Sequence, residues 1–300
     1  TISKGSTGNK SYTANWEIRR YTVTISANTG GTTSVSTLEI NHGSTSTFMI
    51  SPNAGYYIES VSCTNGYTTN AKVGDDQTTI QTVTVSNNGK DMDSICSVSF
   101  SPLTYTISYE LDGGSVTGNP TSYTVESNAI TLNNPTRTGY NFTGWSGSNG
   151  TAQTSVTIPK GSTGDKSYTA NWTQKQYTVS LNRSDGGMLS TSSLTINYGE
   201  TATFTITPSN GYFTTGVSCT NGYTTNATLN TSSTQTVTVS NNNKDATSVC
   251  TITFTEGEDF ATYLTDLAKT DTTNLVANDG TTDKNLRYIG GDPNNYVRFN

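Results

Sequence analysis

Four cysteines are the residues of this chain with the most definite chemistry. They fall two to each copy of an internal repeat, Cys63 with Cys96 and Cys219 with Cys250. Three pairings are possible, and pairing within each copy is favoured because both copies place their cysteines in the same two local contexts. Closing a loop of about 33 residues would stabilise a folded domain by roughly 3.7 kcal/mol in the chain-entropy model. Buried free thiols and a metal site are the alternatives.

A single histidine, His42, is the next candidate for chemistry. The corresponding residue of the second copy is Tyr198, so a metal-binding or proton-transfer role would be missing from one copy, and we predict a structural role. Glycoside hydrolysis needs two acids about 5–10 Å apart, but Asp75 and Asp76 lie in a stretch that the second copy partly deletes. No base is repeated beside the abundant serines and threonines. We therefore predict no catalytic residue, no metal and no cofactor.

A Tyr-Thr-Thr sequence recurs unaltered between the two copies and is a candidate binding loop. Tyrosine rings can stack on sugars or anchor a protein partner. The same rings can instead fill a small core beneath the disulfide, and this alternative stays open. The residues of the candidate loop are Tyr67, Thr68 and Thr69 in the first copy and Tyr223, Thr224 and Thr225 in the second.

The composition of the chain narrows its class. Of the 300 residues, 31 % are hydrophobic and 13 % are charged, but 17 Tyr, 8 Phe and 3 Trp argue against disorder. No apolar run approaches the ~20 residues that a membrane-spanning helix needs, and a net charge of −6 disfavours a nucleic-acid partner. We expect a secreted β protein that neither inserts into a membrane nor binds nucleic acid.

Internal repetition organises the chain into two kinds of module that alternate. KGSTGNKSYTANW at 4–16 returns as KGSTGDKSYTANW at 160–172, and VSCTNGYTTNA at 61–71 returns unchanged at 217–227. We call the two kinds the Trp module and the Cys module. The predicted domains are the tail of a Trp module at 1–16, Cys modules at 21–101 and 177–255, a complete Trp module at 105–173, and the start of a C-terminal module at 256–300. The sequence is therefore expected to begin and end inside domains of a longer protein.

Alternating apolar residues predict the strands that hold these sites. Five or six short strands separated by Gly, Asn and Pro turns predict a compact antiparallel β domain for each Cys module. In the Trp module, Tyr140, Phe142 and Trp145 are expected to lie together as the main core. FATYLTDLAK at 260–269 predicts a short amphipathic helix, and NLRYIGGDPNNYVRFN at 285–300 predicts two short strands around a turn.

The Trp module resembles the internalin-type B repeat, also called the Listeria–Bacteroides repeat. The resemblance is carried by YTISYELDGG, NPTSYT, TLNNPTRTGYNFTGW and GSTGDKSYTANW within 105–173. It implies a small β-grasp, ubiquitin-like fold, found in tandem in bacterial surface proteins. NYGETATFTITPSNGYF at 197–213 resembles the divergent branch of the same family. That branch usually has a Gly-Trp pair where this chain has Ser62-Cys63 and Ser218-Cys219.

These observations lead to a mainly β fold of tandem small domains: a β-grasp-like Trp module alternating with disulfide-containing antiparallel modules. Because the connections at 17–20, 102–104 and 173–176 are short, we expect an elongated, monomeric rod. The predicted function is a non-enzymatic stalk or adhesin at a bacterial cell surface, either secreted or associated with the cell wall. One alternative is that the Cys modules bind a host glycoprotein or glycan. Another is an accessory region of a larger secreted enzyme.

Overall fold

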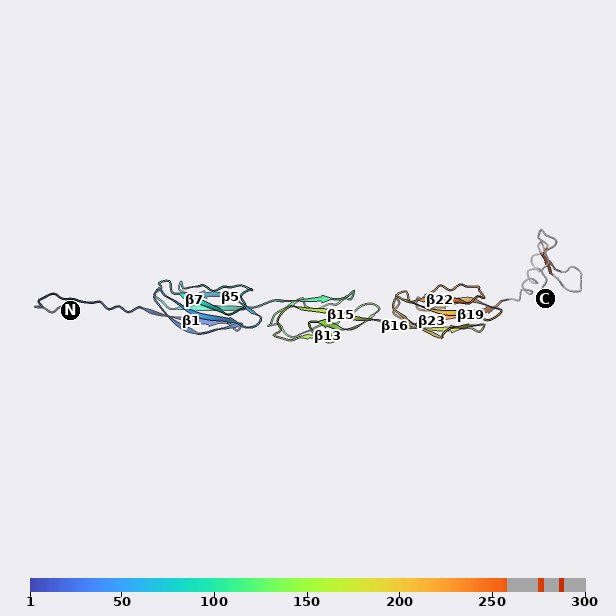
Figure 1. Ribbon diagram of the computed structural model, residues 1–300, viewed down its shortest axis with the longest axis horizontal. Coiled ribbons are helices and arrows are strands. Elements are labelled where there is room, and N and C mark those ends of the chain that lie inside the picture. The colour runs from blue at the N-terminus through green and yellow to red at the C-terminus, as the bar shows by residue number, and fades with distance from the viewer. Residues whose placement is uncertain (258–274, 278–285, 289–300) are drawn as a thin grey trace. The chain divides into compact units, whose positions relative to one another are not determined.

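The computed structural model describes residues 1–257 and two further strands, β24 (Leu275–Ala277) and β25 (Leu286–Tyr288) (Figure 1). These two strands pair antiparallel. Every regular element in this described part is a β-strand, so the predicted mainly β class is confirmed. The helix expected at 260–269 lies outside the described residues, as does the second strand of the hairpin expected at 285–300. Its first strand, β25, pairs instead with β24.

The first Cys module contains two four-stranded sheets around one core. One sheet has the order β3 (Thr37–Asn41), β1 (Arg20–Ala27), β8 (Ser94–Pro102), β5 (Tyr56–Cys63), and the other has the order β2 (Gly31–Thr33), β4 (Thr45–Pro52), β7 (Gln81–Ser86), β6 (Thr68–Thr69). Alternate residues of each strand face inward; in β8 these include Cys96, Val98 and Phe100. The buried cluster draws side chains from both sheets.

The second Cys module repeats this arrangement. Its sheets have the orders β18 (Ser193–Asn197), β16 (Gln176–Arg183), β23 (Ser248–Glu256), β20 (Tyr212–Cys219) and β17 (Gly187–Leu189), β19 (Thr201–Pro208), β22 (Gln235–Ser240), β21 (Thr224–Thr225). Each module therefore has eight strands where the sequence predicted five or six, because two- and three-residue strands carry too little alternation to be recognised. The pairing is also not purely antiparallel, since β1 runs parallel to β8 and β16 runs parallel to β23.

The Trp module is a mixed five-stranded sheet with a small two-stranded one. The larger has the order β10 (Ser122–Tyr123), β9 (Tyr105–Glu110), β15 (Lys166–Gln174), β12 (Tyr140–Gly147), β13 (Gly150–Gln153), and the smaller pairs β11 (Ile130–Thr131) with β14 (Thr157–Ile158). The first and last strands, β9 and β15, are parallel neighbours at the centre, which is the strand arrangement of a β-grasp sheet. Unlike ubiquitin-like folds, its crossover contains β11 and no helix within these described residues.

The aromatic core of the Trp module differs from the expected one. Trp145 is fully buried against the rings of Tyr109 and Tyr168, whose centroids lie 5.7 and 6.4 Å away. Phe142 is only partly buried and instead makes an edge contact with Trp172 at 5.5 Å. Side chains alternate between the two faces of a strand, so residues three apart, such as Phe142 and Trp145, do not share a face.

Two compact units divide the chain by its internal contacts. The first contains Thr1–Pro135 and Thr143–Asn171, and the second contains Thr136–Phe142 and the described residues from Trp172 onward. Residues 1–19 of the first unit form no strand, and all of their side chains are exposed. The domain boundaries inferred from the repeats stay a prediction.

Candidate functional site

Both disulfides form within a Cys module, so the predicted pairing is confirmed. Cys63 bonds to Cys96 and Cys219 bonds to Cys250, at sequence separations of 33 and 31 residues. The partners are directly opposite each other in the antiparallel pairs β5–β8 and β20–β23, with Cα atoms 4.0 Å apart. Because Cys96 and Cys250 are fully buried in the core, each bridge links two neighbouring strands on the face of the sheet that packs against the core.

The candidate Tyr-Thr-Thr loop is mostly part of the core. Tyr67 and Tyr223 are each only 4 % exposed, so their rings do not present a face to a ligand, and the core alternative holds for them. The Tyr67 hydroxyl donates to the carbonyl of Met92 (2.9 Å), and that of Tyr223 donates to the carbonyl of Ala246 (2.8 Å). Thr68 and Thr224 are exposed, and Thr69 and Thr225 are partly buried. Ligand binding by these threonines stays a prediction.

A buried asparagine holds the tyrosine loop in each module. Asn87 is fully buried, and its amide nitrogen donates to the Tyr67 hydroxyl (2.6 Å) and to the carbonyl of Lys90 (2.8 Å). Its amide oxygen accepts from the backbone N–H groups of Gly43 (2.7 Å) and Lys90 (3.0 Å). Asn87 thus joins three turns, and sequence reasoning missed it. The signal was present in QTVTVSNNGKD, which recurs as QTVTVSNNNKD, because a repeated polar pair after a strand is where turn-locking side chains occur.

Asn241 makes the same four bonds in the second module: to the Tyr223 hydroxyl (2.6 Å), the carbonyl and N–H of Lys244 (2.9 and 3.0 Å) and the N–H of Gly199 (2.8 Å). We expect Asn241→Ala to lower the free energy of unfolding of this module by about 2 kcal/mol, because it leaves buried polar groups without partners. Urea unfolding measures this. Asn182→Ala, at an exposed strand position, should change it by less than about 0.5 kcal/mol. Equal effects of the two changes would contradict the assigned role.

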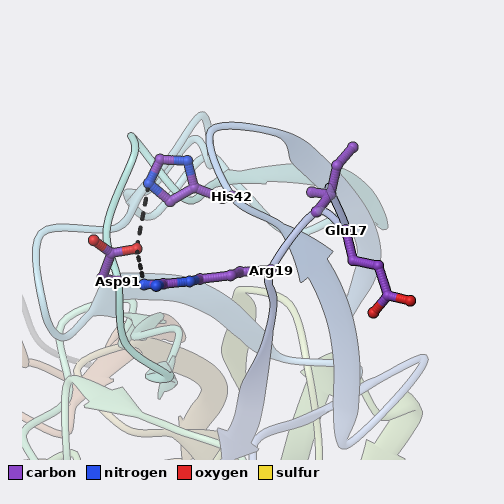
Figure 2. Close-up of a pocket in the computed structure, with 5 residues that line it drawn as sticks. Glu17, Arg19, His42 and Asp91 are labelled. Atoms are coloured by element: carbon purple, nitrogen blue, oxygen red, sulfur yellow. Dashed lines mark ion pairs between the residues drawn. The ribbon is translucent and has the colours of Figure 1, made fainter. Parts of the chain in front are cut away.

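A charged cluster lies at one end of the first Cys module, around Asp91 (Figure 2). The Tyr21 hydroxyl donates to the Asp91 carboxylate (2.7 Å), while Arg19 Nη1 and His42 Nε2 each lie 3.5 Å from it. With Glu17 and Ile18, the residues Arg19, His42 and Asp91 line a pocket of about 450 Å³. The hydrogen bond from Tyr21 lowers the pKa of Asp91 below its usual range and raises that of Tyr21. These exposed ion pairs contribute little stability.

The second module builds the same cluster without an imidazole. Asp245 accepts from Tyr177 and from Lys175, whose Nζ lies 2.9 and 3.1 Å from the two carboxylate oxygens. The bond from Lys175 is the main reason that the pKa of Asp245 is lowered, and burial followed by Asp245 raises the pKa of Tyr177 to about 12. Tyr198 stands where the first module has His42. The chemistry common to both copies is therefore a carboxylate held by a tyrosine and a cation, not an imidazole.

No group of three His, Cys, Asp or Glu side chains within the described residues is arranged to hold a metal ion. The described part of the chain also contains no helix with the length and apolar character that crossing a membrane requires.

Comparison with known proteins points to repeat domains. The model of the Listeria-Bacteroides repeat domain matches residues 105–171, and that of the divergent InlB B-repeat domain matches residues 21–93 and 177–275. No curated protein matches the chain. Among solved structures, the Bacillus anthracis TIE protein is 6 % identical with a TM-score of 0.35, over 79 % of this chain and 51 % of that protein. This chain thus spans about half the length of that protein.

Proposed function

Because the chain belongs to the divergent InlB B-repeat domain family and also contains a Listeria-Bacteroides repeat, we propose that it is a non-enzymatic, tension-bearing stalk segment of a bacterial surface protein. The family is one of repeats in surface proteins, and the two disulfides suit an extracellular setting. In this proposal the modules transmit force between the cell and whatever the protein presents. Attachment to the cell wall and a role as an adhesin belong to the same proposal.

One observation carries this proposal: in all three modules the first and last long strands are parallel neighbours. β1 pairs with β8, β9 with β15, and β16 with β23, each in parallel register. In a parallel pair, the chain enters one strand and leaves the other at opposite ends. Tension along the chain therefore slides the two strands past each other and loads all of their hydrogen bonds together. An antiparallel pair with its free ends on one side would instead open one bond at a time.

The first Cys module offers an internal comparison of these two geometries. Strand β1 has five register partners in β8 and five in β3, the former parallel and the latter antiparallel. We expect a higher unfolding force when the full chain is pulled through attachment points at Arg20 and Pro102 than when it is pulled through Arg20 and Asn41, which face each other across β1 and β3. Single-molecule force spectroscopy measures both, since forced unfolding reports the unfolding rate. Equal forces in the two geometries would overturn the stalk proposal.

Recognition of a host glycoprotein or glycan by the Cys modules is less well supported. The two tyrosines of the candidate loop are buried, which leaves only the threonines of that loop accessible. Families of such repeats are generally non-enzymatic, and the pocket around Asp91 is lined by two acids, one arginine, one histidine and one isoleucine, without a serine or cysteine nucleophile. We therefore favour the mechanical role.

A further inference from the structure

A glycine turn, Arg137–Tyr140, packs against the charged cluster of the second Cys module, within the second compact unit. The backbone N–H of Lys175 donates to the carbonyl of Gly139 (2.9 Å). The ring of Tyr198 lies so close to Gly139 that a Cβ atom added there would be 2.2 Å from the ring carbon Cδ1. Gly139 also has a φ of +78°, which residues other than glycine rarely adopt. The turn thus presents a flat backbone surface that only glycine provides, and Tyr198 covers it.

The first Cys module contains the same receiving surface. Arg19, Tyr21, His42 and Asp91 correspond to Lys175, Tyr177, Tyr198 and Asp245. The backbone that carries them is also the same: the N–H of His42 donates to the carbonyl of Arg19 (2.9 Å), and the N–H of Tyr198 donates to the carbonyl of Lys175 (3.0 Å). An imidazole, like a phenol, is a planar ring that can lie on a glycine backbone.

The exposure of the basic side chain differs between the two copies of the charged cluster. The side chain of Lys175 is 30 % exposed beside the glycine turn, whereas that of Arg19 is 75 % exposed. The residues around Asp91 line an open pocket instead of a contact, as Figure 2 shows for His42, Arg19 and Asp91. The two surfaces share their chemistry and backbone but differ in occupancy.

We propose that the surface formed by Arg19, His42 and Asp91 is a docking site for the glycine turn of a Trp module, with His42 in the place of Tyr198. The N–H of Arg19 would donate to the glycine carbonyl, as that of Lys175 does. The occupant is a turn of the Arg-Thr-Gly-Tyr kind found at Arg137–Tyr140. This inference goes beyond the stalk proposal, since it concerns which turn covers the Asp91 cluster and does not require the chain to bear a load.

The chain's single histidine makes the site measurable. Placing a copy of residues 105–159, which contain no histidine, ahead of Lys4 would complete a Trp module in front of the first Cys module. We expect the rate of His42 carbethoxylation, followed by mass spectrometry, to fall by at least about tenfold in this extended chain. A fall of this size follows if the docked state is ten times more populated than the free state. An unchanged rate would overturn the proposal. So would protection of His42 that rises with concentration in the original chain, because a second copy would then be the occupant.

Two glycines of the added segment provide a matched pair of variants. Glycine to alanine at the copy of Gly139 should restore the reactivity of His42. The same change at the copy of Gly150 should leave His42 protected, because Gly150 has a similar φ, +84°, and nothing within 4 Å of its added Cβ. The two changes impose similar backbone strain, so a loss of protection in both would mean that the glycine surface is not what His42 contacts.

A second experiment uses the original chain and does not depend on the added segment folding. In Tyr198→His, the imidazole introduced at position 198 should react at least about tenfold more slowly than His42 in the same molecule. Gly139→Ala should remove this difference, whereas Gly164→Ala should keep it, since Gly164 has the same φ of +78° and nothing within 4 Å. Equal reactivity of the two imidazoles in Tyr198→His would show that a histidine does not fit beneath the turn and would overturn the proposal.

Discussion

Replacing Cys63 and Cys96 together by alanine should lower the free energy of unfolding of the first Cys module by about 3.7 kcal/mol. The disulfide closes a loop of 33 residues and restricts the unfolded chain, so its removal stabilises the unfolded state. For a domain of this size, the change corresponds to a fall in melting temperature of roughly 15–30 °C. The second Cys module keeps the Cys219–Cys250 bond and serves as a reference in the same molecule.

Differential scanning calorimetry of the double variant should therefore show one Cys-module transition moved to lower temperature and the other unchanged. A shift equivalent to less than about 1 kcal/mol would show that the bridge adds little to what the core already supplies. Force spectroscopy gives an independent reading. Without the bridge, the 33-residue loop adds about 110–120 Å to the extension released when the module unfolds, at the usual 3.3–3.6 Å per residue. For a stalk, the disulfide thus limits how far a module lengthens under load.

The fold class and the disulfides could be predicted from the sequence for local reasons. Alternation of apolar residues identifies long strands such as β8, and identical contexts in two copies restrict how the cysteines pair. The parallel pairing of first and last strands could not be predicted this way, because alternation gives the face of a strand but not its neighbour. Nor could the location of Tyr67: a tyrosine in a Gly-rich loop suits a ligand or a core equally well until Asn87 and Met92 are known to satisfy its hydroxyl.

The repeated KSYTANW sequence shows that local sequence alone does not determine whether a segment forms a strand. At 166–172 it begins β15, and Tyr168 is 4 % exposed. At 10–16 the same seven residues form no strand, and Tyr12 and Trp16 are 68 % and 90 % exposed. The sequence is identical, so its conformation depends on β9 and β12, which lie on either side of β15. Tertiary packing, not intrinsic preference, makes this segment a strand.

Trp145→Ala should lower the free energy of unfolding of the Trp module by about 3–5 kcal/mol, the usual cost of removing a fully buried tryptophan. The side chain is 0 % exposed and contacts rings from both central strands, Tyr109 of β9 and Tyr168 of β15. Those two tyrosines are register partners in the parallel pair that bears the proposed load. The cavity left by Trp145→Ala would therefore lie beside β9 and β15, the two strands that must separate when the module unfolds under force.

Trp16→Ala is the matched control, because Trp16 is 90 % exposed and its removal should change stability by less than about 0.5 kcal/mol. Chemical unfolding followed by circular dichroism compares the two variants. If Trp145 supports the load-bearing pair, Trp145→Ala should also lower the force at which the Trp module unfolds, and Trp16→Ala should not. If Trp145→Ala lowers the free energy of unfolding but leaves the unfolding force unchanged, the core does not contribute to mechanical resistance. The hydrogen bonds of the parallel strand pair would then account for that resistance alone.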